Sequence, residues 1–238
     1  MVNINGHICR ELILSGFLNV KSNEMEKEII KKTEDFVKNK IKGFDSGHDW
    51  WHIERVRGLA IYINSKEKIA DPFILDITSL LHDIADSKFT ADIENGYNDM
   101  AEYLNYIGLS DKAKHIIDVI KNISFSNKKP IGDLHDPLLM VIQDADRLDA
   151  MGAIGIARAF NYGGFKNNTI YDPDEKDSPS TIKHFYDKLL ILKEGMNTET
   201  GRKMASERHE FMKSFLKEFY KEWKFAFKSS GQNRESQI

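Results

Sequence analysis

Proline is scarce in this chain of 238 residues, and its placement constrains the fold more than any other feature. The five prolines stand at positions 72, 130, 137, 173 and 179, so long stretches lack the residue that interrupts helices. Within those stretches apolar residues recur with the period of a helix, and no segment alternates apolar and polar residues as a half-exposed strand does. The pattern predicts an all-α fold.

Two of the prolines mark helix starts. Asp71-Pro72 and Asp136-Pro137 each join a capping aspartate to a proline at the first helical position. The first pair predicts a helix to about Ala85, and the second predicts a helix from Leu138 to about Phe160. Further helices are expected over 25–41, 50–64, 92–107, 110–120, 180–193 and 198–228.

The length and composition fit one domain. With 41% hydrophobic and 30% charged residues, the chain can bury a core and is not expected to be disordered. The first clear amphipathic pattern begins at Met25, so we expect a domain over residues 25–228, an N-terminal extension over 1–24 and a flexible tail over 229–238. The longest irregular stretch, 161–179, is expected to be either a wall beside a functional site or a surface loop.

Charge and cysteine content exclude several classes of protein. Lys plus Arg is 34 and Asp plus Glu is 37, and a net charge of −3 argues against a broad nucleic-acid-binding surface. No apolar run approaches the roughly 20 residues of a membrane span. A signal peptide has basic residues before its apolar stretch, but the acidic Glu11 precedes the one early apolar stretch of this chain. A single cysteine excludes an intramolecular disulfide framework. We therefore expect a cytoplasmic monomer or homodimer that binds neither nucleic acid nor membrane.

Four side chains of the kinds that bind metals fall on three expected helices. His52 lies on the apolar stripe of its helix, His82-Asp83 ends the next apolar helix, and Asp146 continues the buried stripe of a third. A buried carboxylate is costly unless it is paired or bound to metal, and imidazole nitrogen with carboxylate oxygen suits a divalent cation. Each alone has a structural alternative, such as a core histidine or an ion pair with a nearby arginine. Together they favour a metal site.

The strings around these residues resemble the HD-domain superfamily of metal-dependent phosphohydrolases. The resemblance lies in residues 48–56 (HDWWHIERV), 80–88 (LLHDIADSK) and 143–152 (QDADRLDAMG), and it covers roughly residues 25–225. It is strongest with a bacterial subgroup of small single-domain members, some of which are nucleotide pyrophosphohydrolases. It implies a single HD-domain helical bundle with additional C-terminal helices.

The resemblance also implies roles for individual residues. His52, His82, Asp83 and Asp146 would bind one divalent metal ion (Mn, Mg, Fe, Co, Ni or Zn), which lowers the pKa of bound water. Asp83 and Asp86 are the expected catalytic residues, because family members place an acidic residue at the position of Asp86, near the attacking water. The expected phosphate contacts, each of which could instead serve a structural role, are His48, Arg55, Lys88 and Arg147.

The substrate implied is a small phosphorylated metabolite, with a nucleotide favoured. Pyrophosphohydrolysis of nucleoside triphosphates is preferred over 5′-nucleotidase-type cleavage of a phosphomonoester, and a non-catalytic nucleotide-binding regulatory module is the alternative from another class. Diiron oxygenase chemistry would need further histidines, for which His115 and His135 are the candidates. We expect a surface or supporting role for His115 and a helix-capping role for His135-Asp136. The GYP signature of cyclic-dinucleotide phosphodiesterases is lacking.

Overall fold

The structure, a computed structural model, describes residues 4–42, 49–85, 93–123, 135–174 and 178–229. Nine α-helices account for most of these residues, so the all-α prediction is confirmed. Outside the helices, the described chain contains one isolated β-bridge, between Thr169 and Ser180. In chain order the elements are α1 (Ile4–Lys40), α2 (Trp50–Glu67), α3 (Pro72–Leu81), α4 (Ile93–Tyr106), α5 (Ser110–Ile123), α6 (Pro137–Asp149), α7 (Gly152–Phe165), α8 (Thr181–His184), the π-helical turn η1 (Phe185–Leu189), the 3-10 turn η2 (Leu190–Gly195) and α9 (Glu199–Ser229).

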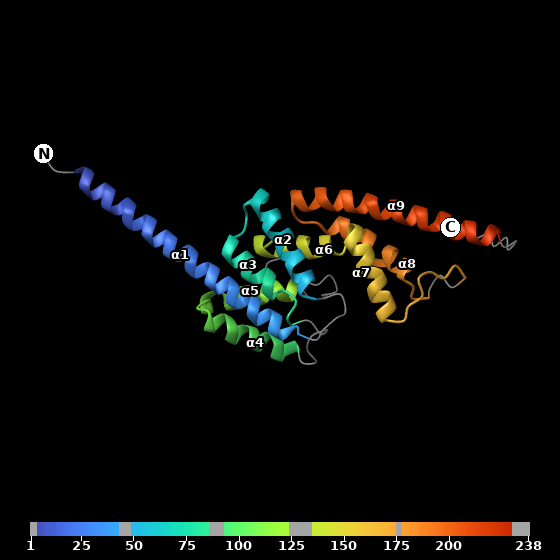
Figure 1. Ribbon diagram of the computed structural model, residues 1–238, viewed down its shortest axis with the longest axis horizontal. Helices are drawn as coiled ribbons and strands as arrows, with labels where there is room; N and C mark the ends of the chain where they lie inside the picture. Colours follow the sequence, from blue (N-terminus) through green and yellow to red (C-terminus); the bar gives the residue numbers. More distant parts are fainter. Residues whose placement is uncertain (1–3, 43–48, 86–92, 124–134, 175–177, 230–238) are drawn as a thin grey trace.

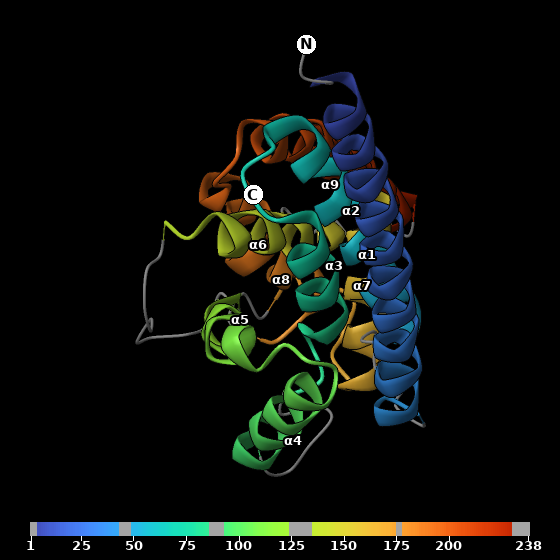
Figure 2. The ribbon, with the colours of Figure 1, turned by 90° about the vertical axis from the view of Figure 1, so that its left-hand side faces the viewer.

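Helix α3 forms the centre of the bundle because it is apolar on nearly every side. Every residue from Leu75 to Leu81 is buried, including three polar ones. A helix without a polar face must be covered all round, and α1, α2, α5 and α6 pack against it (Figure 2). The predicted cap is present: the Asp71 carboxylate accepts a hydrogen bond from the Ile74 N–H, and Pro72 occupies the first turn.

Helix α1 begins earlier than the sequence pattern predicted. It runs without interruption from Ile4, and its N-terminal half extends away from the rest of the bundle (Figure 1). Residues 4–24 contain no proline, so the helix expected from Met25 continues through the segment expected to be an extension. The C-terminal half is tied to the bundle by Arg57 of α2, whose guanidinium binds the carboxylates of Glu34 in α1 and Asp76 in α3.

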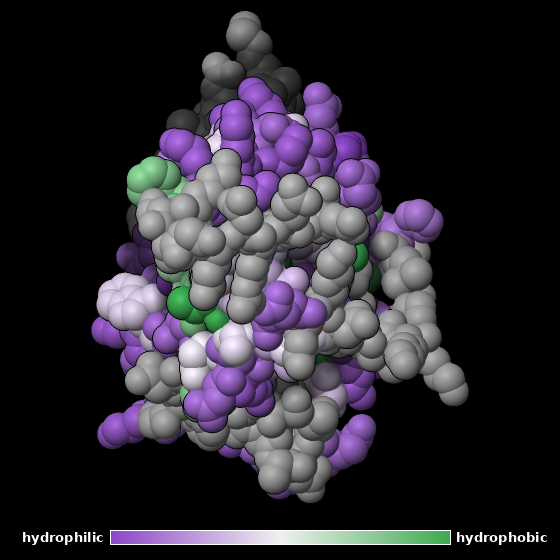
Figure 3. Space-filling model, turned by 90° about the vertical axis from the view of Figure 1, so that its right-hand side faces the viewer, coloured by the Kyte–Doolittle hydropathy of each residue, from purple (hydrophilic) through white to green (hydrophobic). Residues whose placement is uncertain are grey.

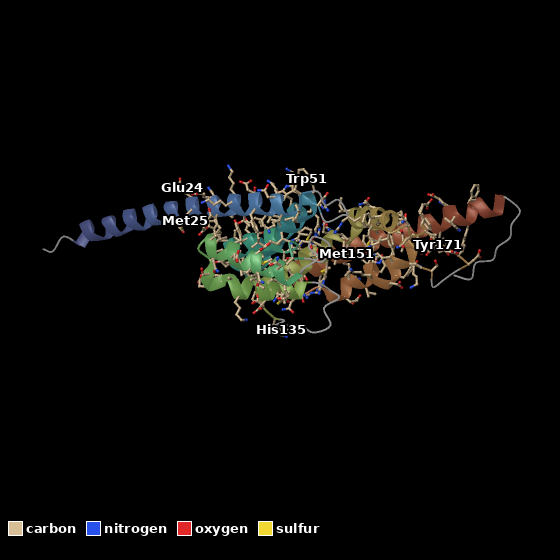
Figure 4. All side chains as sticks on the ribbon, turned by 90° about the horizontal axis from the view of Figure 1, so that it is seen from below. Glu24, Met25, Trp51, His135, Met151 and Tyr171 are labelled. Atoms are coloured by element: carbon tan, nitrogen blue, oxygen red, sulfur yellow. The ribbon has the colours of Figure 1, made fainter. Side chains whose placement is uncertain are left out.

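The single helix expected from Leu138 to Phe160 is wrong, because the chain breaks it into α6 and α7. The Ala150 N–H closes α6 on the carbonyls of Asp146 and Arg147. Met151 is extended, and Gly152 has φ +71°, a backbone conformation that side-chain-bearing residues rarely adopt. Met151 is buried in the middle of the molecule (Figure 4). The break lets α7 leave in a new direction.

The C-terminal half is built around α9, which packs against α6, α7 and η2. In Figure 1, α9 runs along the upper right of the molecule. Tyr171, in the stretch expected to be irregular, packs edge-on against Phe219, Tyr220 and Trp223 of α9. Tyr171 is therefore packed against α9, and whether this stretch walls the site stays a prediction. At this end of the molecule the coloured atoms are mostly hydrophilic (Figure 3). Within the described residues, no helix combines the length and apolar character that crossing a membrane requires.

Candidate metal centre

Three helix ends meet at one point of the bundle. Helix α2 packs against both α3 and α6, which brings the start of α2 to the ends of the other two. Asp49 caps α2 by accepting a hydrogen bond from the His52 N–H at 2.8 Å, which fixes the backbone of His52 in the first turn. His82 follows α3 as its C-cap, and Asp83 comes next in the turn. The candidate metal-binding side chains therefore lie at or just after the ends of rigid helices.

Three of the four predicted ligands, His52, His82 and Asp83, form one group there, and Asp146 lies beside His52. The Nε2 atoms of His52 and His82 are 3.3 Å apart. Carboxylate oxygens of Asp83 and Asp146 lie 3.7 Å and 3.6 Å from the His52 Nε2. His52, His82 and Asp83 are buried and offer ligand atoms that lie within 4.8 Å of one another. The Asp146 side chain is 33% exposed and marks the side of the centre that is open to solvent.

The hydrogen-bond partners of the two imidazoles indicate that the centre suits a cation. The His82 Nδ1 is 2.7 Å from the Ser79 carbonyl, which only accepts, so Nδ1 carries the proton. The His52 Nδ1 faces the Asp149 carboxylate at 2.8 Å in the same way. Burial lowers the pKa of His52 and favours its neutral form. Two Nε2 lone pairs therefore face each other, an arrangement that is repulsive alone and attractive around a shared metal ion.

Asp149 supports the centre from behind His52. Its carboxylate accepts hydrogen bonds from His52, from Arg55 of α2 and from Arg158 of α7. Burial alone would raise the pKa of Asp149, but the hydrogen bonds from His52 and Arg55 outweigh burial and hold the pKa well below its usual range. The carboxylate is therefore ionised, and the His52 Nδ1 is its donor.

The predicted phosphate contacts differ in their surroundings. Arg55 is bound to Asp149 but keeps 34% of its side chain exposed. Arg147 donates through Nη1 to the Gly195 carbonyl, and burial lowers its pKa. His48, Asp86 and Lys88 lie outside the described residues.

His115 and His135 lie near the start of α6, whereas the candidate metal centre lies near its end. The His115 Nε2 is 2.6 Å from a carboxylate oxygen of Asp136, in an exposed pair. The other oxygen of Asp136 caps α6 through the N–H groups of Leu138 and Leu139, as predicted. His135 is exposed at the edge of the molecule (Figure 4).

Two arginines that contact the C-terminal end of α6 had no predicted role. Arg158 binds Asp149 at 2.6 Å, and Arg208 of α9 donates to the Leu148 carbonyl. In one continuous helix, nine residues would separate Arg158 from Asp149 by about 13 Å along the axis. Only the break before Gly152 brings the two together, and the glycine was the one available signal.

An all-α bundle in which two imidazoles and a carboxylate are grouped at helix ends fits the class of HD-type hydrolases. The chain belongs to the HD superfamily of hydrolases, whose members depend on metal. It is 39% identical over 191 residues to Bacillus subtilis YpgQ, a protein described as uncharacterized, covering 79% of this chain and 90% of YpgQ.

Solved structures agree with this assignment. An HD-superfamily hydrolase from Bacillus thuringiensis is 39% identical with a TM-score of 0.69, over 84% of this chain and 98% of that one. The crystal structure of YpgQ in complex with ADP is 38% identical with a TM-score of 0.68, over 81% of this chain and 97% of that one. No protein-family profile matches the chain.

Proposed function

We propose that this protein is a metal-dependent phosphohydrolase that cleaves nucleoside triphosphates to monophosphate and pyrophosphate. The observation that carries the proposal is the pair of facing imidazole nitrogens flanked by Asp83 and Asp146. Four protein ligands of this mixed kind leave positions for water and for a phosphate oxygen. The ADP bound to the relative YpgQ supports a nucleotide as the substrate class.

The chain's own residues divide the work. His52, His82, Asp83 and Asp146 would hold one divalent cation, which when bound activates water and neutralises phosphate charge. Asp146 lies at the solvent side, where a substrate would approach. Asp86 is proposed to orient or deprotonate the attacking water.

Arg55 is the proposed phosphate contact with the strongest support. Its guanidinium is held by Asp149, directly behind the ligand His52, while part of the side chain reaches solvent. A guanidinium whose position is already fixed binds a phosphate oxygen with little loss of conformational freedom. His48, Lys88 and Arg147 are proposed as further contacts, and Arg147 would have to give up its bond to the Gly195 carbonyl.

The test is product analysis on the full chain. Nucleoside mono-, di- and triphosphates are incubated with Mn²⁺, Mg²⁺, Co²⁺ or Ni²⁺, and the products are separated by ion-exchange chromatography. We expect nucleoside monophosphate and pyrophosphate from triphosphates, and no product from the Asp83→Ala variant. Orthophosphate and nucleoside released from monophosphates would instead identify a 5′-nucleotidase. Nucleotide binding without turnover under any metal would identify a regulatory module and overturn the proposal.

A further inference from the structure

The most heavily bonded side chain of the centre is Asp149, which is not one of the four ligands. Only 2% of its side chain is exposed. One oxygen accepts from the Arg55 Nε at 2.7 Å, and the other accepts from the His52 Nδ1 at 2.8 Å, the Arg158 Nη1 at 2.6 Å and the Arg55 Nη2 at 3.1 Å. The donors come from α2 and α7, whereas Asp149 ends α6.

The two arginines fix how the carboxylate is turned. Arg55 grips both oxygens in a fork, which sets the plane of the carboxylate. Arg158 holds the second oxygen from another direction. Because Asp149 cannot rotate without breaking these bonds, the oxygen that faces His52 is held in place, and the imidazole in front of it is held as well.

The contact with Asp149 also decides which nitrogen of His52 can bind metal. A carboxylate accepts hydrogen bonds and donates none, so the imidazole must place its proton on Nδ1. The Nε2 lone pair is then available, and it points toward the His82 Nε2 and the Asp83 carboxylate. A histidine with its proton on Nε2 could not act as a ligand in this position.

We infer that Asp149 is a positioning residue, locked by Arg55 and Arg158, that makes His52 competent to bind the metal ion. The inference rests on the metal centre of the proposed function but not on the nucleotide reaction. Hydrogen-bond partners behind ligating histidines typically change metal affinity 10- to 100-fold.

The decisive variant is Asp149→Asn, which keeps the shape and adds a donor. If the introduced amide nitrogen faces His52, the imidazole must accept at Nδ1 and its proton moves to Nε2. If the amide nitrogen faces Arg55 and Arg158 instead, two hydrogen-bond donors oppose each other and the hydrogen bonds to the arginines are lost. We expect the affinity of the full chain for Mn²⁺, measured by calorimetry without nucleotide, to fall about 10- to 100-fold. Unchanged Mn²⁺ affinity in the folded variant would overturn the inference.

Asp144→Asn is the matched control. Asp144 is a second buried carboxylate of α6, and it accepts hydrogen bonds from Asn197 and Thr198 just before α9. Both variants should lower thermal stability, but only Asp149→Asn should weaken Mn²⁺ binding. An equal loss of Mn²⁺ affinity in both would indicate general loosening of α6 and would contradict a positioning role.

A second readout needs no variant of Asp149 to fold. In the metal-free wild-type chain labelled with ¹⁵N-histidine, the NMR signal of His52, assigned by its disappearance in His52→Gln, should show the proton on Nδ1. A proton on Nε2 would overturn the inference. The two proposals also fail separately: normal Mn²⁺ binding that depends on Asp149, without hydrolysis of any nucleotide, rejects the proposed reaction alone.

Discussion

Helix α6 carries two buried carboxylates, Asp144 and Asp149, one on each side of the proposed ligand Asp146. The carboxylate of Asp144 accepts from the N–H groups of Asn197 and Thr198 and from both of their side chains. These donors are neutral and lie just before α9. Asp149 instead binds two arginines and a histidine that faces the metal centre.

The comparison shows that burial alone does not reveal what a carboxylate does. Asp144 anchors the start of α9 to α6, so its role is to hold two helices together. Asp149 binds two arginines and the proposed ligand His52, so its proposed role passes through His52 to the metal ion. The identity of the donors distinguishes a structural carboxylate from a functional one. Variants at or near Asp144 and Asp149 can test this distinction.

The largest effect is expected from Asp83→Ala, which breaks the centre itself. Removing one of the converging ligands leaves two imidazoles without their buried carboxylate partner. We expect Mn²⁺ affinity to fall by more than the roughly 100-fold upper limit for a supporting residue such as Asp149. Calorimetric titration of both variants gives the order. A smaller loss in Asp83→Ala than in Asp149→Asn would mean that the metal binds elsewhere.

The next largest effect is expected on stability, from a substitution beside Asp144. A Cβ at Gly201 would lie 2.2 Å from an Asp144 carboxylate oxygen and 2.8 Å from the Thr198 Oγ1, so Gly201→Ala must push this anchor apart. We expect the free energy of unfolding in urea to drop by about 1–3 kcal/mol, with Mn²⁺ affinity unchanged.

Gly164→Ala is the control for that variant, because nothing lies within 4 Å of its added Cβ in α7. It should leave the free energy of unfolding unchanged or slightly raise it. Weakened Mn²⁺ binding in Gly201→Ala would show that the Asp144 anchor also serves the metal centre.

A smaller effect is expected from Arg158→Met, which removes one of the two arginines on Asp149. Arg55 and His52 still hold the carboxylate, so Asp149 keeps most of its orientation. We expect Mn²⁺ affinity to fall less than about tenfold, between wild type and Asp149→Asn. A loss as large as that of Asp149→Asn would make Arg158, and not the carboxylate alone, the element that fixes His52.

The smallest effect is expected from His115→Ala. The pair of His115 with Asp136 is exposed, and such pairs contribute about 0–1 kcal/mol to stability. Mn²⁺ affinity and stoichiometry should not change in titrations of the full chain. A drop from two bound ions to one would place a second metal at His115.

Much of this architecture is readable in the sequence because its causes are local. Asp71-Pro72 and Asp136-Pro137 start helices where predicted, since caps act within one turn. The apolar stripe predicted that His52 would be buried, and it is, whereas Asp146, also expected on a buried stripe, is 33% exposed. The sequence did not predict which donors bind Asp149, because one of them, His52, lies 97 positions away along the chain. The break before Gly152 was missed because a glycine inside a helical pattern is ambiguous: Gly155, in the same stretch, lies within α7 without breaking it.

Because of the break before Gly152, the contact between Arg158 and Asp149 depends on the number of residues between Gly152 and Arg158. Gly152 begins α7, so the direction in which Arg158 points around the helix depends on the six residues counted from the glycine. One residue inserted between them would rotate Arg158 by about 100° around the helix and take it away from Asp149. One residue inserted after Arg158 would leave the contact intact. The metal centre thus depends on a count of residues as well as on their identities.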